Sequence, residues 1–186
     1  MEFNCLILGD KDVGKTSYIN RIINGDFTSQ QKNDISLRLK TNKGIINFNF
    51  FDNSLPKIVD CVIIMFDINH SESFSNILIY HKYILDTFGN IPFVICGNKC
   101  DKYGMNRNVQ KLAKFLVSNG NLNKNYYTIS AKSLYNSHTP LLFLLEKLLN
   151  DGPITLSEYD QEDFDYYHIL PIPIPITIIS TKASNI

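Results

Sequence analysis

The stretch Gly9-Asp10-Lys11-Asp12-Val13-Gly14-Lys15-Thr16 fits the pattern G-x-x-x-x-G-K-[ST], and the interpretation of the chain starts from it. Residues 3–8 before it form an apolar run typical of a buried strand, and residues 17–23 after it have helical spacing. This order predicts a phosphate-binding loop whose backbone N–H groups surround phosphate oxygens. Lys15 is expected to reach the terminal phosphates, and the Thr16 hydroxyl to coordinate Mg²⁺. The predicted phosphate-binding residues are Gly9, Asp10, Lys11, Asp12, Val13, Gly14, Lys15, Thr16 and Ser17.

The composition is that of an ordinary soluble globular protein. Of 186 residues, 44% are apolar and 19% are charged. Eighteen basic and eighteen acidic residues cancel, so the totals give no reason to expect direct nucleic-acid binding. The cysteines lack C-x-x-C spacing, which predicts reduced, buried thiols. No targeting segment or membrane span is visible, and residues 182–186 contain no cysteine for prenylation, so we expect no lipid anchor.

Strand-like and helix-like stretches alternate along the chain. Further strands are predicted at 45–51, 61–66, 93–96 and 126–129, and helices at 71–88, 109–118 and 139–149. This alternation predicts an α/β fold, with a mostly parallel central sheet and helices on both faces, over residues 1–150. Residues 151–186 change character, becoming first acidic and then proline-rich, and we expect a flexible tail there.

Two short segments follow predicted strands and suit guanine. Asn98-Lys99-Cys100-Asp101 follows one strand and Ser130-Ala131-Lys132 follows another, at the edge where open α/β sheets bind ligands. The Asp101 carboxylate can accept hydrogen bonds from the guanine ring N–H and exocyclic amine, a pair that adenine lacks. The Lys99 stem can lie against the base, and the Ala131 N–H can donate to the guanine carbonyl. The predicted base-binding residues are Asn98, Lys99, Asp101, Ser130, Ala131 and Lys132, and the predicted ligand is GTP or GDP.

With these motifs in place, residues 3–150 resemble the Ras superfamily of small GTPases, and the Ran branch most closely. The most Ran-like stretches are residues 61–67, 91–101 and 126–136. The resemblance implies a P-loop NTPase G-domain and a monomeric GTP/GDP switch in nucleocytoplasmic transport, present in nucleus and cytoplasm. It also implies karyopherin-type receptors and exchange factors as partners. Phe27 matches the aromatic that packs against guanine, and Asp52 matches the aspartate that binds Mg²⁺ through water.

The chain departs from that family where GTP is hydrolysed. After Asp52 the sequence reads Asn53-Ser54-Leu55-Pro56 instead of T-A-G-Q, and eight residues separate Asp52 from Cys61. The missing glycine senses the γ-phosphate and the missing glutamine orients the attacking water. We therefore assign no catalytic residue and expect weak or absent hydrolysis. Two hypotheses stay open: a slow Ran-like GTPase, and a pseudo-GTPase adaptor that uses the G-domain as a scaffold. A P-loop kinase lacks support.

Other departures concern the nucleotide itself. Lys11 and Asp12 occupy positions that carry glycine in Ran and Ras. Lys11 could lie along the γ-phosphate or point to solvent, whereas Asp12 places a negative charge near the phosphates. We therefore expect faster nucleotide release than in an ordinary family member. The Mg²⁺-binding threonine of the first switch corresponds to Thr28 or to Ser29, and either could be an ordinary loop residue.

Overall fold

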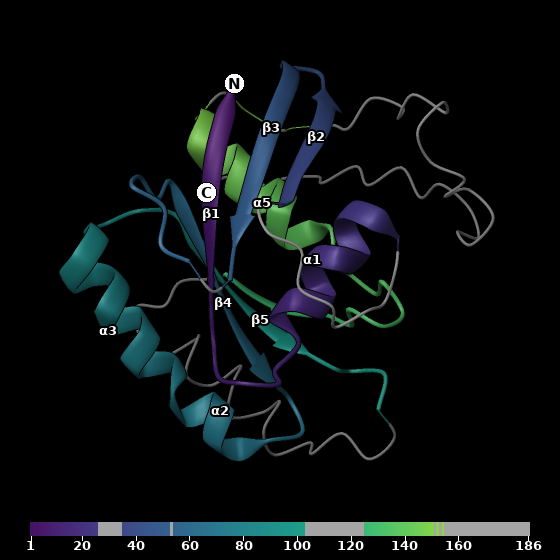
Figure 1. Cartoon of the computed structure of the whole chain (residues 1–186), viewed down its shortest axis with the longest axis vertical. Coiled ribbons are helices and arrows are strands. Elements are labelled where there is room, and N and C mark those ends of the chain that lie inside the picture. Colours follow the sequence, from purple (N-terminus) through teal and green to yellow (C-terminus); the bar gives the residue numbers. More distant parts are fainter. Residues whose placement is uncertain (26–34, 53, 103–124, 151, 153, 155–186) are drawn as a thin grey trace, which may run out of the picture.

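The computed structural model describes residues 1–25, 35–52, 54–102, 125–150, 152 and 154. Phe27, both candidates for the switch threonine, the predicted helix 109–118 and almost all of the predicted tail lie outside the described residues. The described part contains a six-stranded sheet of order β2-β3-β1-β4-β5-β6 (Figure 1). The strands are β1 (Glu2–Leu8), β2 (Ile35–Thr41), β3 (Gly44–Phe51), β4 (Cys61–Asp67), β5 (Phe93–Asn98) and β6 (Tyr126–Thr128).

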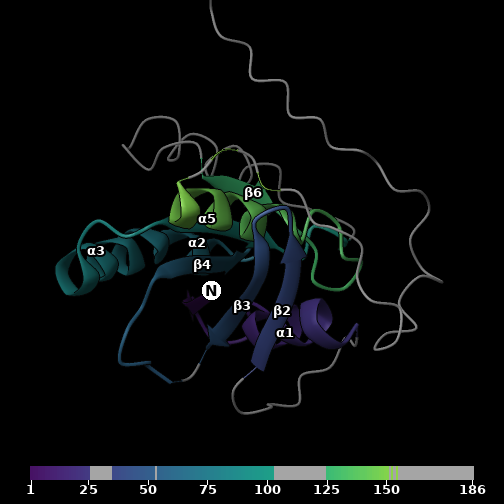
Figure 2. The ribbon, with the colours of Figure 1, turned by 90° about the horizontal axis from the view of Figure 1, so that it is seen from above.

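All neighbouring strands run parallel except β2 and β3, which form an antiparallel hairpin. Figure 2 shows this hairpin beside α1. The described helices are α1 (Lys15–Asn24), α2 (Ser71–Ser75), α3 (Ile77–Phe88) and α5 (Thr139–Leu149). None of them is long and apolar enough to cross a membrane.

The core is divided between the two faces of the sheet because successive side chains of a strand point to opposite sides. Along β1, Cys5 and Ile7 pack on one face with α1 and α5, while Leu6 packs on the other with α2 and α3. Every residue of the central strand β4 is buried, as expected for a parallel strand covered on both sides. The predicted mostly parallel sheet with helices on both faces is therefore confirmed.

Two features of the fold differ from the sequence interpretation. The single helix expected over 71–88 is broken at Asn76, which ends α2 and precedes α3. The second feature, strand β2, was not predicted at all, although its sequence alternates: Leu37 and Leu39 are buried, whereas Ser36 and Arg38 are exposed. This alternation is the signal that would have identified it.

The connection between β3 and β4 is short because of the register of these strands. Parallel strands usually need a crossover of about a dozen residues or more. Here Leu6 of β1 is level with Phe51 at the end of β3 on one side, and with Val62 near the start of β4 on the other. The chain therefore has to cross only two strand spacings, about 10 Å. Asp60 ties the connection to β1: its N–H donates to the Asn4 carbonyl at 2.9 Å, and the Asn4 N–H donates to its carboxylate at 2.7 Å.

Candidate functional site

A cavity of about 730 Å³ lies at the carboxyl end of the sheet, where the sequence placed the nucleotide. Its volume is in the range of small-molecule sites. The phosphate loop and the base-binding segments both contribute to its wall, although they are more than 80 residues apart in the chain. The lining residues are Lys11, Asp12, Gly14, Lys15, Thr16, Ser17, Asn98, Lys99, Asp101, Lys102, Ala131 and Lys132.

The phosphate loop folds tightly against the sheet, and two of its glycines have no room for a side chain. A Cβ on Gly9 would lie 2.1 Å from the Met65 carbonyl oxygen, and one on Gly14 would lie 2.4 Å from Nδ2 of Asn98. Gly14 also has a φ of +100°, in the left-handed region that favours glycine. Asp12 has a φ of +64°, so an aspartate takes up a strained conformation here.

The side chain of Lys15 folds back onto the first residues of the phosphate loop. Its ammonium donates hydrogen bonds of 2.8 Å to the carbonyls of Gly9 and Asp10. Burial lowers the pKa of Lys15, although the nearby carboxylates of Asp52, Asp10 and Asp12 oppose this shift. A polyphosphate would supply the negative charge that a half-buried ammonium favours. This geometry fits the role predicted for Lys15.

Thr16 and Asp52 meet at the same end of the cavity. The Thr16 hydroxyl donates to Oδ2 of Asp52 at 2.6 Å, so two hard oxygen ligands converge from α1 and from the end of β3. Mg²⁺ is usually bound by one or two such protein oxygens together with phosphate oxygens and water. Among the described residues, no group of three histidine, cysteine or acidic side chains could bind a metal alone. The pair therefore fits a Mg²⁺ ion that arrives with the nucleotide.

On the base side, Asn98 joins three segments. Its buried amide donates to the Val13 carbonyl at 2.9 Å and accepts the Ala131 N–H at 2.9 Å. It thus fixes the phosphate loop relative to the segment after β6. The Ala131 N–H, expected to donate to guanine, is bonded to Asn98 here, so the guanine contact stays a prediction.

Asp101 is oriented by Ser130. The Ser130 hydroxyl donates to Oδ1 of Asp101 at 2.6 Å. Ser130 is fully buried and does not line the cavity, so its side chain contacts the Asp101 carboxylate, and its own predicted contact with the base stays a prediction. Asp101 does line the cavity, as expected for the group that reads guanine.

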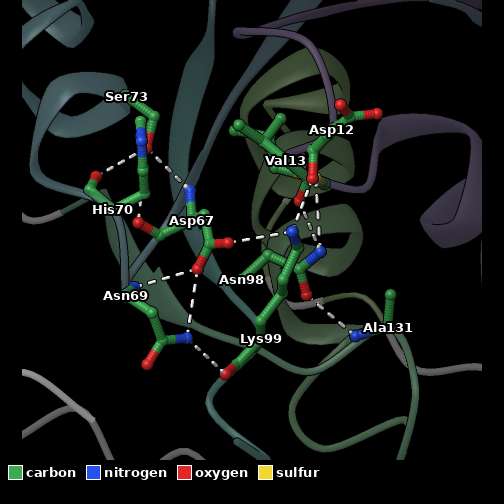
Figure 3. A network of polar contacts seen from close by, with 10 residues as sticks. Asp12, Val13, Asp67, Asn69, His70, Ser73, Asn98, Lys99 and Ala131 are labelled. Carbon is green, nitrogen blue, oxygen red and sulfur yellow. Dashed lines mark hydrogen bonds and ion pairs between the residues drawn. The ribbon is translucent and has the colours of Figure 1, made fainter.

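Lys99 sits in a polar network that the sequence interpretation missed (Figure 3). Its ammonium lies 2.8 Å from Oδ2 of Asp67 and also donates to the Asp12 carbonyl of the phosphate loop. Asn69 donates to the Lys99 carbonyl at 3.1 Å. The available signal was the position of Asp67, a carboxylate at the carboxyl end of a buried parallel strand.

The side chains of Asp10 and Val13 turn away from the cavity, so any phosphate contact of these two residues would be made by their backbone N–H groups, as the sequence analysis expects of this loop. Val13 is buried in the core. The Asp10 carboxylate accepts hydrogen bonds from Nδ2 of Asn76 at 2.9 Å and from the Tyr80 hydroxyl at 2.7 Å. Burial and the Asp10 carboxylate raise the pKa of Tyr80 to about 12. The break before α3 thus brings Asn76 to the phosphate loop, a contact that sequence spacing did not reveal.

The model for the Ras family matches residues 4–150 of the chain. The match begins in β1 and ends directly after α5, so it includes most of β1, all of the other described strands and the loops that line the cavity. It covers well over half of the chain. The match is to the family as a whole, and the likeness to the Ran branch stays a prediction.

Proposed function

The chain belongs to the Ras family and is a small GTP-binding protein; on that premise, we propose that it binds GTP or GDP with Mg²⁺ but hydrolyses GTP weakly or not at all. The observation that carries this proposal is the connection between β3 and β4. Its residues 53–60 contain neither glycine nor glutamine. The groups that sense the γ-phosphate and orient water in this family therefore have no counterpart between Asp52 and β4. Loss of one such group typically lowers a rate by about 10²- to 10³-fold.

The short connection between β3 and β4 is compatible with a well-formed sheet, and this supports the interpretation that it is a genuine part of the fold. Strand register allows eight residues to join Asp52 to Cys61. The described part of this connection has no helix, and it is tied to β1 through Asp60 and Asn4. Residues predicted to bind the nucleotide lie together, since Lys15, Thr16 and Asp101 all line one cavity, and this supports retained binding.

A finer assignment rests on the resemblance to the Ran branch. Residues 61–67, 91–101 and 126–136 are its most similar stretches. They support a role as a switch in nucleocytoplasmic transport, with karyopherin-type receptors and exchange factors as partners and a distribution between nucleus and cytoplasm. This role requires that partners distinguish the GTP-bound form from the GDP-bound form.

The alternative is a pseudo-GTPase adaptor, in which bound nucleotide only stabilises a scaffold. One observation favours it: Leu55 and Ile58, on the shortened connection, are 59% and 66% exposed. A single exposed apolar side chain is ordinary, but these two lie three residues apart on the segment that lacks the family's glycine and glutamine. An adaptor would bind its partner equally well with GDP or GTP.

Single-turnover hydrolysis tests the main proposal. The purified chain is loaded with GTP labelled at the γ-phosphate, and phosphate release is followed with and without cell extract. We expect release far slower than in an ordinary small GTPase under both conditions. Turnover at an ordinary rate would overturn the proposal. Affinity capture with the chain loaded with GDP or with a non-hydrolysable GTP analogue then separates the two hypotheses, because only a switch gives partners that depend on the nucleotide.

A further inference from the structure

Asp67, at the end of β4, is connected to Lys99 in two ways, directly and through Asn69 (Figure 3). Its Oδ2 lies 2.8 Å from the Lys99 ammonium. Its Oδ1 accepts a hydrogen bond of 3.1 Å from the Asn69 side-chain amide, which also donates to the Lys99 carbonyl at 3.1 Å. One carboxylate therefore binds the head of the lysine directly and its main chain through Asn69.

The carboxylate itself is firmly placed. The Asp67 N–H donates to the Ser73 hydroxyl at 3.1 Å, and the Asn69 N–H donates to Oδ1 of Asp67 at 2.9 Å. Asp67 is only 9% exposed, and burial alone would disfavour its charge. Hydrogen bonds from Lys99 and Asn69 outweigh burial, so the pKa of Asp67 is lowered. The group therefore stays ionised at neutral pH.

Lys99 needs such support because its backbone is strained. Its φ is +67°, a left-handed conformation that is unfavourable for a non-glycine residue. The side chain lines the cavity between two anchors, the Asp67 carboxylate and the Asp12 carbonyl. Without the first anchor, the ammonium would keep only the second, and the stem would gain rotational freedom.

We propose that Asp67 is a positioning residue for base binding: it fixes the Lys99 stem along the cavity wall and thereby slows the release of guanine nucleotide. The inference rests on the proposed function, since it requires the cavity to bind a guanine nucleotide. Asp67 does not line the cavity, and it acts on the nucleotide only through Lys99.

The test uses the full chain with a fluorescent GDP analogue bound, displaced by excess GDP at constant salt and Mg²⁺. We expect Asp67→Asn to raise the dissociation rate about tenfold, because it removes a charged hydrogen-bond acceptor. Asp86→Asn, at an exposed carboxylate on α3, is the matched control and is expected to leave the rate unchanged. In a Lys99→Met background, Asp67→Asn is expected to add no further increase, which a general loosening of the fold would not reproduce.

A second variant covers the case in which Asp67→Asn does not fold. Asn69→Ala keeps the ion pair and removes the side-chain hydrogen bonds of Asn69 to the Asp67 carboxylate and to the Lys99 carbonyl, and we expect a two- to threefold increase in dissociation rate. An unchanged rate in the folded Asp67 variant, or an equal increase in the Lys99→Met background, overturns the inference. If Asp67→Asn does not fold, an unchanged rate for Asn69→Ala overturns it. If the wild-type chain does not bind the analogue at all, the proposed function itself is overturned.

Discussion

The base side of the cavity and the connection after Asp52 are built very differently. On the base side, Asn98 and Lys99 donate to consecutive carbonyls of the phosphate loop, and Asp67 adds a partly buried ion pair with Lys99. The described part of the connection runs without helix from the end of β3 to β4 and exposes Leu55 and Ile58. The residues predicted to bind guanine are thus tied to the phosphate loop, whereas the glycine and glutamine that the family uses in hydrolysis have no counterpart between Asp52 and β4. Under the proposed function, this difference means that nucleotide binding and GTP hydrolysis depend on separate regions of the fold.

The largest effect is expected from a substitution that disturbs the contact between the phosphate loop and the base side of the cavity. Gly14→Ala would place a Cβ 2.4 Å from Nδ2 of Asn98 and strain a backbone with φ of +100°. We expect nucleotide affinity to fall by about 100-fold or more, measured by equilibrium titration with a fluorescent GDP analogue. Gly44→Ala is the matched control, because Gly44 has a φ of +98° but nothing within 4 Å of its Cβ position. A similar loss of affinity in both variants would contradict the argument.

A smaller effect is expected where the phosphate loop contacts α3. Tyr80→Phe removes the 2.7 Å hydrogen bond to Asp10 and leaves that carboxylate with Asn76. We expect the GDP dissociation rate to rise about fivefold to tenfold, since hydrogen bonds to charged groups are among the stronger ones. Tyr83→Phe, on the exposed side of α3, should change the rate less than twofold. Equal rates in the two variants would show that Asp10 does not steady the loop.

A change in the opposite direction is expected from the two residues that replace family glycines. Substituting Lys11 and Asp12 together by glycine removes the attractive Lys11 charge and the repulsive Asp12 charge near the phosphates and relieves the φ of +64° at position 12, and we expect the two effects at Asp12 to dominate. We expect GDP dissociation to slow by about fivefold at low salt and by less at high salt. Asp12→Asn separates charge from backbone strain. An unchanged dissociation rate in the double variant would refute the prediction of fast release.

The smallest effect on the nucleotide is expected in the connection itself. Asp60→Ala removes the acceptor of the Asn4 N–H, and we expect the free energy of unfolding to fall by about 1 kcal/mol. The GDP dissociation rate should stay within about twofold of wild type, because Asp60 does not line the cavity. Denaturant unfolding and nucleotide displacement measure the two quantities separately. A large change in the GDP dissociation rate would contradict the view that the connection after Asp52 and the base side act independently.

Local patterns predicted much of this molecule. The phosphate loop, five of the six described strands and the base-binding segments follow from short stretches with recognisable chemistry. The features that were missed depend on partners far apart in sequence: Asp10 with Tyr80 is separated by 70 residues, and Lys99 with Asp67 by 32. Single residues in such pairs look like ordinary polar positions. The break at Asn76 was missed for the same reason, since apolar spacing continues through it and its partner is the phosphate loop.

Phe51 of β3 and Val62 of β4 are both paired with Leu6 of β1, and this register has a consequence for protein engineering. Because the two strand ends stand only two strand spacings apart, the sheet sets no particular length for the segment between them. Each doubling of a flexible loop costs only about 0.6 kcal/mol in closure entropy. A longer segment with its own glycine and glutamine could therefore be inserted after Asp52 as a unit. Under the proposed function, the segment between Asp52 and β4 is the place where hydrolysis of GTP would be restored without rebuilding the sheet.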